Sequence, residues 1–402
     1  MTQIEQFSTW HAEISHDSER AVALLTETLL EQLGDEGATR AAAGSQDVLP
    51  LPAEALRHDH WSFVTRRVDR SVPQVLLTGD RQPQVGDVVL ARVEQLGHHG
   101  NLQLVDGRRR RLFPGDLVIV TYANRYACEQ FEAEVPQSLA ACHLVAGGGI
   151  AARALSWHDR IVKGPTAIRP LGLLGDGQGR PVNVADFALQ PVSLPGEAPP
   201  VFAVLGTAMD AGKTETAAHL VRGLRAAGRR AGYIKVTGTG AGGDGWLLRD
   251  AGADSVLDFT DAGLPSTWRT PIARLEAVID VLVSNSVRAG MDAIVMEIAD
   301  GVYQQETRQL LRSKAFARHV SGIVLAARDA MGASAGLCAL AAQKRPVLAL
   351  SGLLSASPLQ RREAEAATGI ETLNREALAS TTVALRLIAA VEAAPQSGVA
   401  CS

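Results

Sequence analysis

One glycine-bounded segment constrains the fold of this chain more than any other. The apolar run 201–205 (VFAVL) leads into GTAMDAGKT over residues 206–214, and a helix-patterned stretch follows directly. A strand, a tight loop and a helix that opens on Lys-Thr form a cradle in which backbone N–H groups face an anion. This order predicts a phosphate-binding loop at the edge of an α/β sheet.

The side chains of this loop have distinct predicted tasks. Lys213 would reach the outer phosphates of a nucleotide, and the Thr214 hydroxyl would bind Mg²⁺. Five residues separate Gly206 from Gly212, one more than in the common form of the loop. The expected nucleotide-binding residues span the loop and the first helical turn: Gly206, Asp210, Ala211, Gly212, Lys213, Thr214 and Glu215.

The chain from residue 198 to 402 alternates apolar runs with amphipathic segments. This alternation predicts a mostly parallel, doubly wound sheet covered by helices on both faces, which binds ligands at the carboxyl ends of its strands. The predicted strands are 201–205, 231–236, 255–259, 293–297, 321–326 and 346–350, with helices near 213–227, 272–289, 304–315, 332–343, 358–367 and 380–393.

Charged residues follow the predicted strands at the edge where the phosphate loop lies. Lys235 ends the second strand and Asp244 closes the glycine-rich stretch after it, while Glu297 and Asp300 follow the fourth strand. Carboxylates opposite a phosphate loop usually hold Mg²⁺. We therefore expect Thr214, Asp244 and Glu297 to be metal ligands and Lys213, Lys235, Glu297 and Asp300 to be catalytic.

The chemistry of the acceptor stays open at this stage. A second cation beside the loop lysine suits an anionic acceptor, because it would offset repulsion between two negative groups. Glu297 or Asp300 could be a metal ligand or a general base. Residues 258–267 carry two carboxylates and several hydroxyls, which suit either an acceptor pocket or an Asp-capped turn.

These motifs resemble the dethiobiotin synthetase-like branch of P-loop NTPases, which also includes the cobyrinate amidoligases. The likeness covers residues 200–375 and rests on the loop at 206–214, on Lys235 and on Val295-Met-Glu297. It implies that Lys213 and Lys235 bind phosphate and a carboxylate-like group of the substrate. It also implies that Thr214, Asp244 and Glu297 organise Mg²⁺.

The chain departs from that family at several positions. Ala208 and Met209 stand where the family commonly has Asp and Thr, and Val236 stands where it has Pro. These changes put the substrate contacts in doubt. The chain is also similar to uncharacterised bacterial P-loop proteins related to D-glutamate N-acyltransferases, whose members carry an extra N-terminal domain.

The first half of the chain predicts two further units. Residues 1–70 hold an amphipathic helix, near 13–33, and a linker; the helix could pack on its own chain or on a second copy in a homodimer. Residues 71–197 alternate with period two and predict a small, mainly β, barrel-like domain. Gly147–Gly149 permit close backbone approach to the other domain or to a ligand.

The preferred function is ATP- and Mg²⁺-dependent phosphoryl transfer to a small, anionic metabolite, or its ligation through a phosphate intermediate. The alternative is a regulatory or chaperone-type GTPase that binds partners through the N-terminal domain. Against it, residues 351–358 after the last strand hold no carboxylate to read guanine. The net charge of −4 makes nucleic acid an improbable partner. No apolar run of membrane-spanning length occurs, so we expect a cytoplasmic protein without membrane contact.

Overall fold

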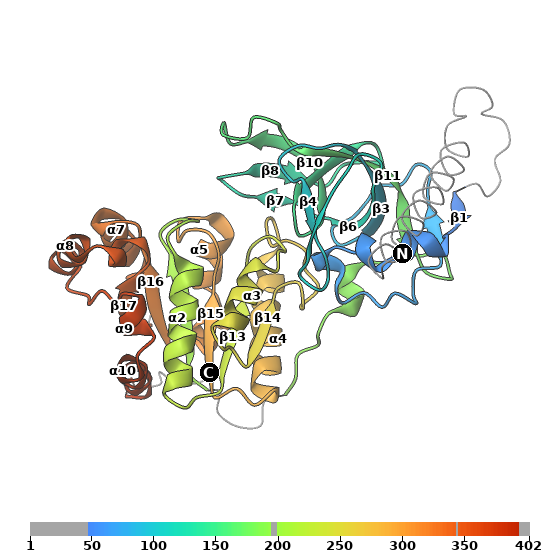
Figure 1. The fold of residues 1–402 in the computed structure, drawn as a ribbon. Helices are drawn as coiled ribbons and strands as arrows, with labels where there is room; N and C mark the ends of the chain where they lie inside the picture. Colours follow the sequence, from blue (N-terminus) through green and yellow to red (C-terminus); the bar gives the residue numbers. More distant parts are fainter. Residues whose placement is uncertain (1–46, 194–198, 343–344, 394–402) are drawn as a thin grey trace, which may run out of the picture.

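The computed structural model describes residues 47–193, 199–342 and 345–393. They form two sheet-based halves, called here the β-domain (47–193) and the P-loop domain (199–393), which lie side by side in Figure 1. The predicted helix at 13–33 falls outside these residues. The division of the chain at residues 70 and 198 stays a prediction, although residues 47–70 pack with the β-domain: Trp61 is fully buried there.

The P-loop domain is built on six parallel strands in the order β14-β13-β15-β12-β16-β17. Each lies within two residues of a predicted strand. The strands are β12 (Val201–Gly206), β13 (Ala231–Lys235), β14 (Ser255–Asp258), β15 (Ala293–Glu297), β16 (Gly322–Ala326) and β17 (Val347–Ser351). The helices are α2 (Lys213–Ala226), α3 (Gly243–Asp250), α4 (Ile272–Arg288), α5 (Gln305–Leu311), α6 (Lys314–His319), α7 (Ala330–Leu340), α8 (Pro358–Thr368), α9 (Arg375–Leu378) and α10 (Thr381–Glu392).

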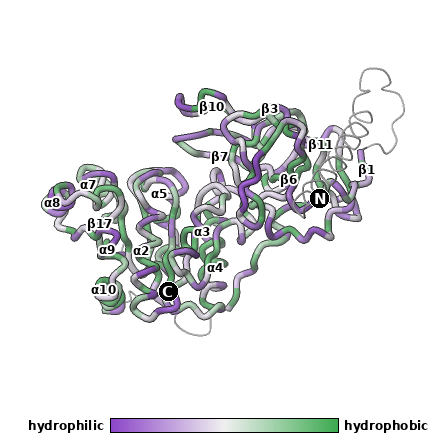
Figure 2. The backbone as a smooth tube through the Cα atoms, viewed as in Figure 1, coloured by the Kyte–Doolittle hydropathy of each residue, from purple (hydrophilic) through white to green (hydrophobic). Residues whose placement is uncertain are grey.

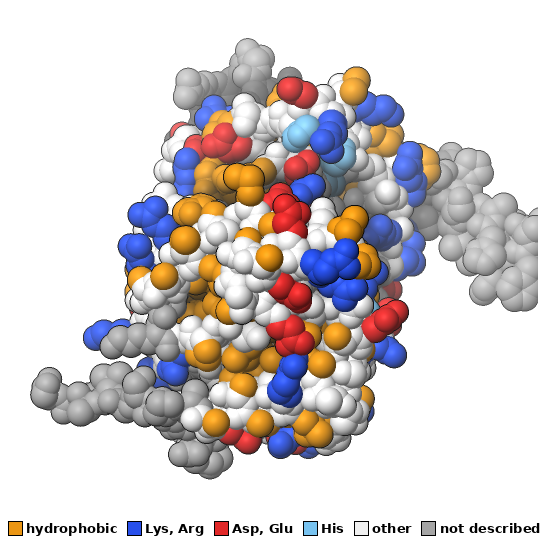
Figure 3. Space-filling model, turned by 90° about the vertical axis from the view of Figure 1, so that its left-hand side faces the viewer, with side chains coloured by type: hydrophobic (Ala, Val, Ile, Leu, Met, Phe, Trp, Pro, Cys, Tyr) orange, Lys and Arg blue, Asp and Glu red, His pale blue; other side chains and the backbone are white. Residues whose placement is uncertain are grey.

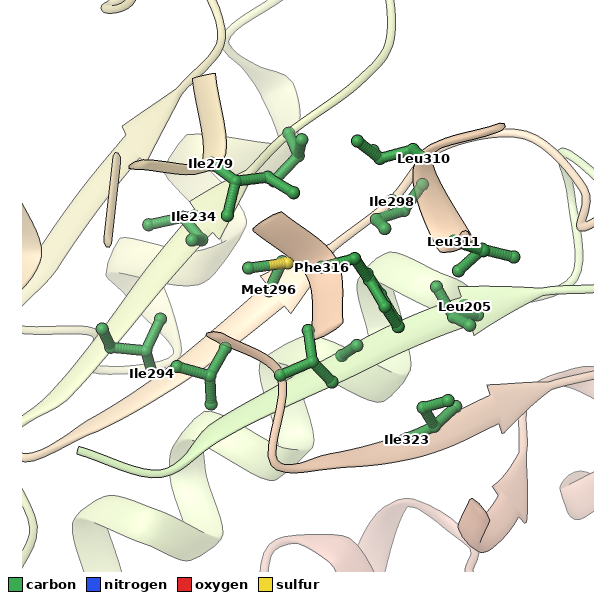
Figure 4. Close-up of a cluster of buried hydrophobic side chains, with 14 of the residues drawn as sticks. Leu205, Ile234, Ile279, Ile294, Met296, Ile298, Leu310, Leu311, Phe316 and Ile323 are labelled. Atoms are coloured by element: carbon green, nitrogen blue, oxygen red, sulfur yellow. The ribbon is translucent and has the colours of Figure 1, made fainter. Parts of the chain in front are cut away.

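Strand β12 lies in the middle of the sheet and faces a separate core on each side. Leu205 packs with α4 to α8, whereas Val204 packs with α2, α3 and α10. This alternation follows from the period of two along a strand buried on both faces. Figure 4 shows the first core, where Phe316 lies over Met296 and Leu205. The carboxyl end of β12, and the loop after it, are thereby held rigidly.

The β-domain contains a mixed sheet of nine strands. Five of them close a ring, because β9 pairs with both β10 and β11 while β3 and β6 link those two strands from the other side. Strands β6 and β10 run parallel, and the other pairs of the ring are antiparallel. The nine strands are β1 (Val48–Pro50), β2 (Val75–Leu77), β3 (Val88–Gln95), β6 (Leu117–Tyr122), β7 (Arg125–Tyr126), β8 (Phe131–Glu134), β9 (Cys142–Ala146), β10 (Ile150–Trp157) and β11 (Thr166–Gly175). Strands β4 (Asn101–Gln103) and β5 (Arg109–Arg111) pair in a separate two-stranded sheet.

Each half has its own hydrophobic interior, and Figure 2 shows hydrophobic segments in both. Figure 3 views the side of the P-loop domain that carries α7, α8 and α10. Acidic and basic side chains both occur on that face, and neither sign covers it.

Lowering the pH is expected to destabilise the β-domain through His99. Burial, helped by the neighbouring Arg125 guanidinium, lowers the pKa of His99 to about 3. The unfolded chain binds a proton near pH 6.5, so between these values it holds more protons than the folded chain. Stability should fall as the pH drops through that range, by at most about 1.4 kcal/mol per pH unit for this group.

Urea unfolding at pH 4.5 and 7.5 checks this expectation. The His99→Gln variant should lose less stability between the two pH values than the natural chain does. Because burial also lowers the pKa of His60 and His143, some acid sensitivity should remain. An unchanged pH dependence in the variant would contradict the assignment to His99.

Candidate functional site

The phosphate loop lies between the end of β12 and the start of α2, and glycines shape both of its ends. Gly212 has a φ of 91°, and a Cβ there would come within 3.1 Å of Gly352 Cα. A Cβ at Gly206 would lie 2.8 Å from Lys213 Cδ. Gly212 is thus needed for its left-handed backbone, and Gly206 leaves room for the side chain of Lys213.

Lys213 is 4% exposed, and its ammonium group is bound by backbone carbonyls. Nζ donates to Ala208 O (2.7 Å), Met209 O (2.9 Å) and Asp300 O (2.8 Å). Burial lowers the pKa of Lys213, although Glu297 and Asp300 act in the opposite direction. A buried cation that has only neutral partners is favourably placed to exchange them for an anion.

Glu297, at the end of β15, is the centre of a buried polar cluster and is 1% exposed. Thr214 Oγ1 donates to Glu297 Oε1 over 3.3 Å, and Tyr233 OH donates to Oε2 over 3.0 Å. Lys235 Nζ lies 3.4 Å from Oε1. Lys235 and Glu297 are register partners on the adjacent strands β13 and β15, which explains why the two side chains meet.

Lys235 is paired with two carboxylates, Glu297 and Asp244. Burial would lower the pKa of Lys235, but these two negative groups outweigh it and raise that pKa. Asp244 is in the first turn of α3, not in an open loop. The expectation of an anionic acceptor depended on Lys235 being a second free cation. Because Asp244 and Glu297 already neutralise its charge, the structure does not support that expectation.

The residues predicted to hold Mg²⁺ fit that ion in part. A hydroxyl and a carboxylate are the oxygen donors that Mg²⁺ prefers, and the hydrogen bond between Thr214 and Glu297 shows that they face a common point. Asp244 is held by Lys235 instead. Within the described ranges no three His, Cys, Asp or Glu side chains gather as a metal cage. This suits Mg²⁺, which is usually bound by few protein ligands and by substrate phosphates.

The other predicted loop residues occupy different positions. Asp210 is exposed on the loop, and Ala211 is buried, with its carbonyl accepting from Leu353 N (3.1 Å). Glu215 does not face the loop lysine but lies 3.8 Å from Arg375 Nε and 3.7 Å from His219 Nδ1. Its role in nucleotide binding therefore stays a prediction.

Asp300 connects the loop lysine to a pocket between the two domains. Its φ of 61° is left-handed, which is rare outside glycine, and its carbonyl accepts from Lys213. Burial raises the pKa of the Asp300 carboxyl group, with Lys213 opposing. The carboxylate makes no hydrogen bond or ion pair with any other residue in the described part of the chain.

The pocket beside Asp300 is built from both domains. Trp268 lies after β14 and Glu306 in α5, while Tyr126, in β7, comes from the β-domain. The rings of Tyr126 and Trp268 are 6.1 Å apart between centroids. Sequence patterns did not reveal these residues, since chain positions so far apart give no sign that they meet. The complete lining is Tyr126, Thr237–Thr239, Ser266–Trp268, Asp300, Gln304 and Glu306.

Residues 237–244, the glycine-rich stretch after β13, form the main seam with the β-domain. Gly242 N donates to Gln103 Oε1 over 2.8 Å. A Cβ at Gly148 would lie 1.9 Å from Gly240 O, so the two backbones touch. Within the three-glycine run at 147–149, Gly148 thus allows the β-domain backbone to lie directly against the P-loop domain.

An ionic contact closes the same seam and corrects one expectation. Arg66 Nη2 lies 3.1 Å from Asp258 Oδ1 and 2.7 Å from Asp261 Oδ2. These carboxylates hold the β-domain, and so they are not free to bind an acceptor. Only the end of the 258–267 segment, at Ser266 and Thr267, reaches the pocket.

No protein-family model matches the sequence, and a comparison with curated proteins finds no relative. None of the helices in the described ranges is both long and apolar enough to cross a membrane.

Partial structural likenesses exist to FtsY proteins and to a signal recognition particle protein. Chloroplast FtsY from Physcomitrella patens matches with 17% identity over 45% of this chain and 59% of its own, at a TM-score of 0.31. The 54 kDa signal recognition particle protein from Aeropyrum pernix K1, solved with GDP, matches with 18% identity over 50% of this chain and 47% of its own, at 0.32. FtsY from Thermotoga maritima matches with 17% identity over 50% and 73%, at 0.30.

This chain therefore spans only about half to three fifths of the first two of these structures. TM-scores this low assign neither a nucleotide nor a partner to it. The resemblance to the dethiobiotin synthetase-like branch stays a prediction from motifs.

Proposed function

We propose that this protein transfers the γ-phosphoryl group of a Mg²⁺-bound nucleoside triphosphate, ATP by preference, to a small metabolite. The resulting phosphate is either the product or the activated intermediate of a ligation. The observation that carries the proposal is the hydrogen bond between Thr214 and Glu297 next to the buried Lys213, on whose ammonium group the Glu297 carboxylate acts electrostatically. Phosphoryl transfer needs this combination of a cation, a metal-binding hydroxyl and a carboxylate.

The residues of the cluster have separable tasks in this reaction. Lys213 would leave its three carbonyl partners and bind the β- and γ-phosphates. Thr214 and Glu297 would hold Mg²⁺, which supplies charge neutralisation on the phosphate oxygens. Tyr233 and Lys235 fix the two oxygens of Glu297, so that its carboxylate is oriented before substrates arrive.

The transfer itself involves one bond made and one broken. An acceptor oxygen or nitrogen bonds to the γ-phosphorus, while the bond from that phosphorus to the β–γ bridging oxygen breaks and the nucleoside diphosphate leaves. The proton of the acceptor group passes to the Asp300 carboxylate. A raised pKa suits Asp300 to this task, because proton acceptors work best when their pKa lies closer to the working pH.

The choice between adenine and guanine nucleotides distinguishes the proposed phosphoryl transfer from a regulatory GTPase. Two serines at and just after the end of β17 are already engaged: Ser351 Oγ donates to Leu373 O (2.9 Å) and Ser355 Oγ to Gly352 O (2.7 Å). Neither supplies the carboxylate that usually reads guanine. This supports ATP as the nucleotide.

Calorimetric titration with ATP and with GTP, each with Mg²⁺, tests the proposal. We expect ATP to bind at least ten times more tightly than GTP. The Lys163→Ala variant, which removes an exposed lysine of the β-domain, should bind ATP like the natural chain. A preference for GTP would favour the regulatory function, and binding of neither nucleotide would overturn the proposal.

A further inference from the structure

The pocket between the domains, lined by Tyr126, Ser266–Trp268, Asp300 and Glu306, has an uncompensated negative charge. Glu306 is 9% exposed, and its hydrogen bonds come from neutral groups only. Arg269 N donates to Oε1 over 2.8 Å, and Gln304 Nε2 donates to Oε2. No lysine or arginine in the described ranges forms an ion pair with Glu306. A buried carboxylate of this kind is stabilised by a cation that enters the pocket.

The guanidinium group of Arg269, next to Trp268 in the chain, points away from Glu306 and toward the β-domain. Arg269 has a φ of 61°, and its side chain pairs with Glu134 of the β-domain. It also lies over the Trp268 ring, 4.4 Å from the centroid. Arg269 therefore offers its backbone N–H to Glu306 and its charge to Glu134. The charge on Glu306 is left for a ligand.

A second, independent observation concerns Ser266. This residue is 3% exposed and lines the pocket, yet its Oγ has no hydrogen-bond partner among the described residues. Buried hydroxyls are almost always satisfied, and an orphan beside a pocket indicates a missing ligand group. An ammonium group has three donors and could satisfy both Ser266 and Glu306.

Aromatic rings complete the lining. Tyr126 and Trp268 are inclined at 40° to each other, and both contribute to the same pocket. Ring faces attract ammonium groups, most strongly where water is excluded. Because the Arg269 guanidinium already lies over the Trp268 ring, this attraction is assigned to the Tyr126 ring. A carboxylate ligand would find no cation in this lining, and two carboxylates, Asp300 and Glu306, would repel it.

We propose that this pocket receives the primary ammonium group of the acceptor, a group about the size of a water molecule, and holds it between Glu306 and Ser266 beside Tyr126. The rest of the small molecule would lie outside the pocket. The ammonium site itself does not depend on the proposed function, but calling its ligand the acceptor does. That step rests on Asp300, which lines the pocket and accepts a hydrogen bond from the loop residue Lys213. The β-domain thus supplies part of the substrate site through Tyr126.

A native cysteine allows a direct test without nucleotide. Cys128 is exposed, and its Sγ donates to Tyr126 OH over 3.0 Å. The full chain is exposed, under equal reducing conditions, to cystamine, bis(2-hydroxyethyl) disulfide and 3,3′-dithiodipropionate. Peptide mass spectrometry then measures the mixed disulfide at Cys128, with exposed Cys338 of the same molecule as the internal reference.

We expect the cysteamine adduct at Cys128 to exceed the carboxylate adduct at least tenfold after correction by Cys338. The preference should fall about tenfold in Glu306→Gln, and Asp300→Asn, which suits a left-handed backbone, should also reduce it. The matched control is Glu129→Gln, which removes a half-buried carboxylate next to Cys128 that pairs with Arg160 outside the pocket, and it should leave the preference unchanged. Thermal unfolding verifies that each variant is folded.

Three results would overturn the inference: equal capture of the three probes, a preference that persists in both pocket variants, or one that is lost in Glu129→Gln. Failure here is distinguishable from failure of the proposed function, because labelling needs no nucleotide. If the amine probe is preferred but no nucleotide binds, the ammonium site would stand and the proposed phosphoryl transfer would be wrong. Nucleotide binding without the preference would remove the ammonium assignment alone.

Discussion

Replacing Lys213 with alanine is expected to abolish nucleotide-dependent turnover, by at least a hundredfold. On the proposed function, the Lys213 ammonium group would bind the phosphates, and loss of a single preorganised charge donor in a closed site typically costs a factor of about 10²–10³. The fold should persist, because the buried ammonium has only neutral partners and its removal also removes its desolvation cost. Release of phosphate or diphosphate from Mg²⁺-ATP measures the effect.

Two comparisons make this result specific. Lys163→Ala removes an exposed lysine and should keep full turnover. Circular dichroism and the urea midpoint of Lys213→Ala should match those of the natural chain. Turnover within twofold of the natural value in a folded Lys213→Ala protein would exclude the loop as the phosphate site.

Arg66→Ala is expected to destabilise the chain by about 3–5 kcal/mol, the typical loss when one partner of a buried ion pair is removed. The Arg66 side chain is 18% exposed, and its partners Asp258 and Asp261 are 15% and 8% exposed. Burial would lower the pKa of Arg66, but the two carboxylates raise it. Without Arg66, both carboxylates would remain buried beside each other. Urea unfolding at pH 7 measures the loss.

The neighbouring Arg67 provides a matched control. It is 35% exposed and 3.6 Å from Asp261, so Arg67→Ala should cost less than about 1 kcal/mol. The sign of the pH effect offers a second check. Burial already raises the pKa of Asp261, and loss of Arg66 should raise it further. Arg66→Ala should therefore be less destabilising at pH 5 than at pH 8, and equal losses for the two arginine variants would refute the argument.

Much of the P-loop domain could be predicted because its signals are local. Its strands are apolar runs, and each helix carries its own pattern of buried residues. The exceptions have physical reasons. Helix α3 has three glycines over residues 242–245 and looks like a loop, but Gln103 of the β-domain accepts from its N-terminal Gly242 N–H. The predicted helix at 304–315 divides where Ser313 caps α6 through Phe316 N.

The candidate site was predictable where residues belong to the loop motif, as Lys213 and Thr214 do, or end strands. Glu297 and Lys235 could be located because both terminate strands at the sheet edge that carries the loop. Tyr233 lies inside an apolar strand, where nothing in the pattern distinguishes it from a core residue. The ion pair of Lys235 with Asp244 depends on the first turn of α3, which the sequence did not indicate. Tyr126 belongs to the other domain, and only the folded chain brings it to Trp268.

The backbone contact between Gly148 and Gly240 constrains how this chain can evolve. Neither residue can gain a side chain without pushing the halves apart, and the loop at 237–244 would move with them. A substitution at Gly148 is therefore expected to disturb the ion pair between Lys235, which ends β13 just before that loop, and Asp244, which ends the loop. Recombination that exchanged one half for that of a distant relative would break a fitted pair, so the two halves are expected to be inherited together.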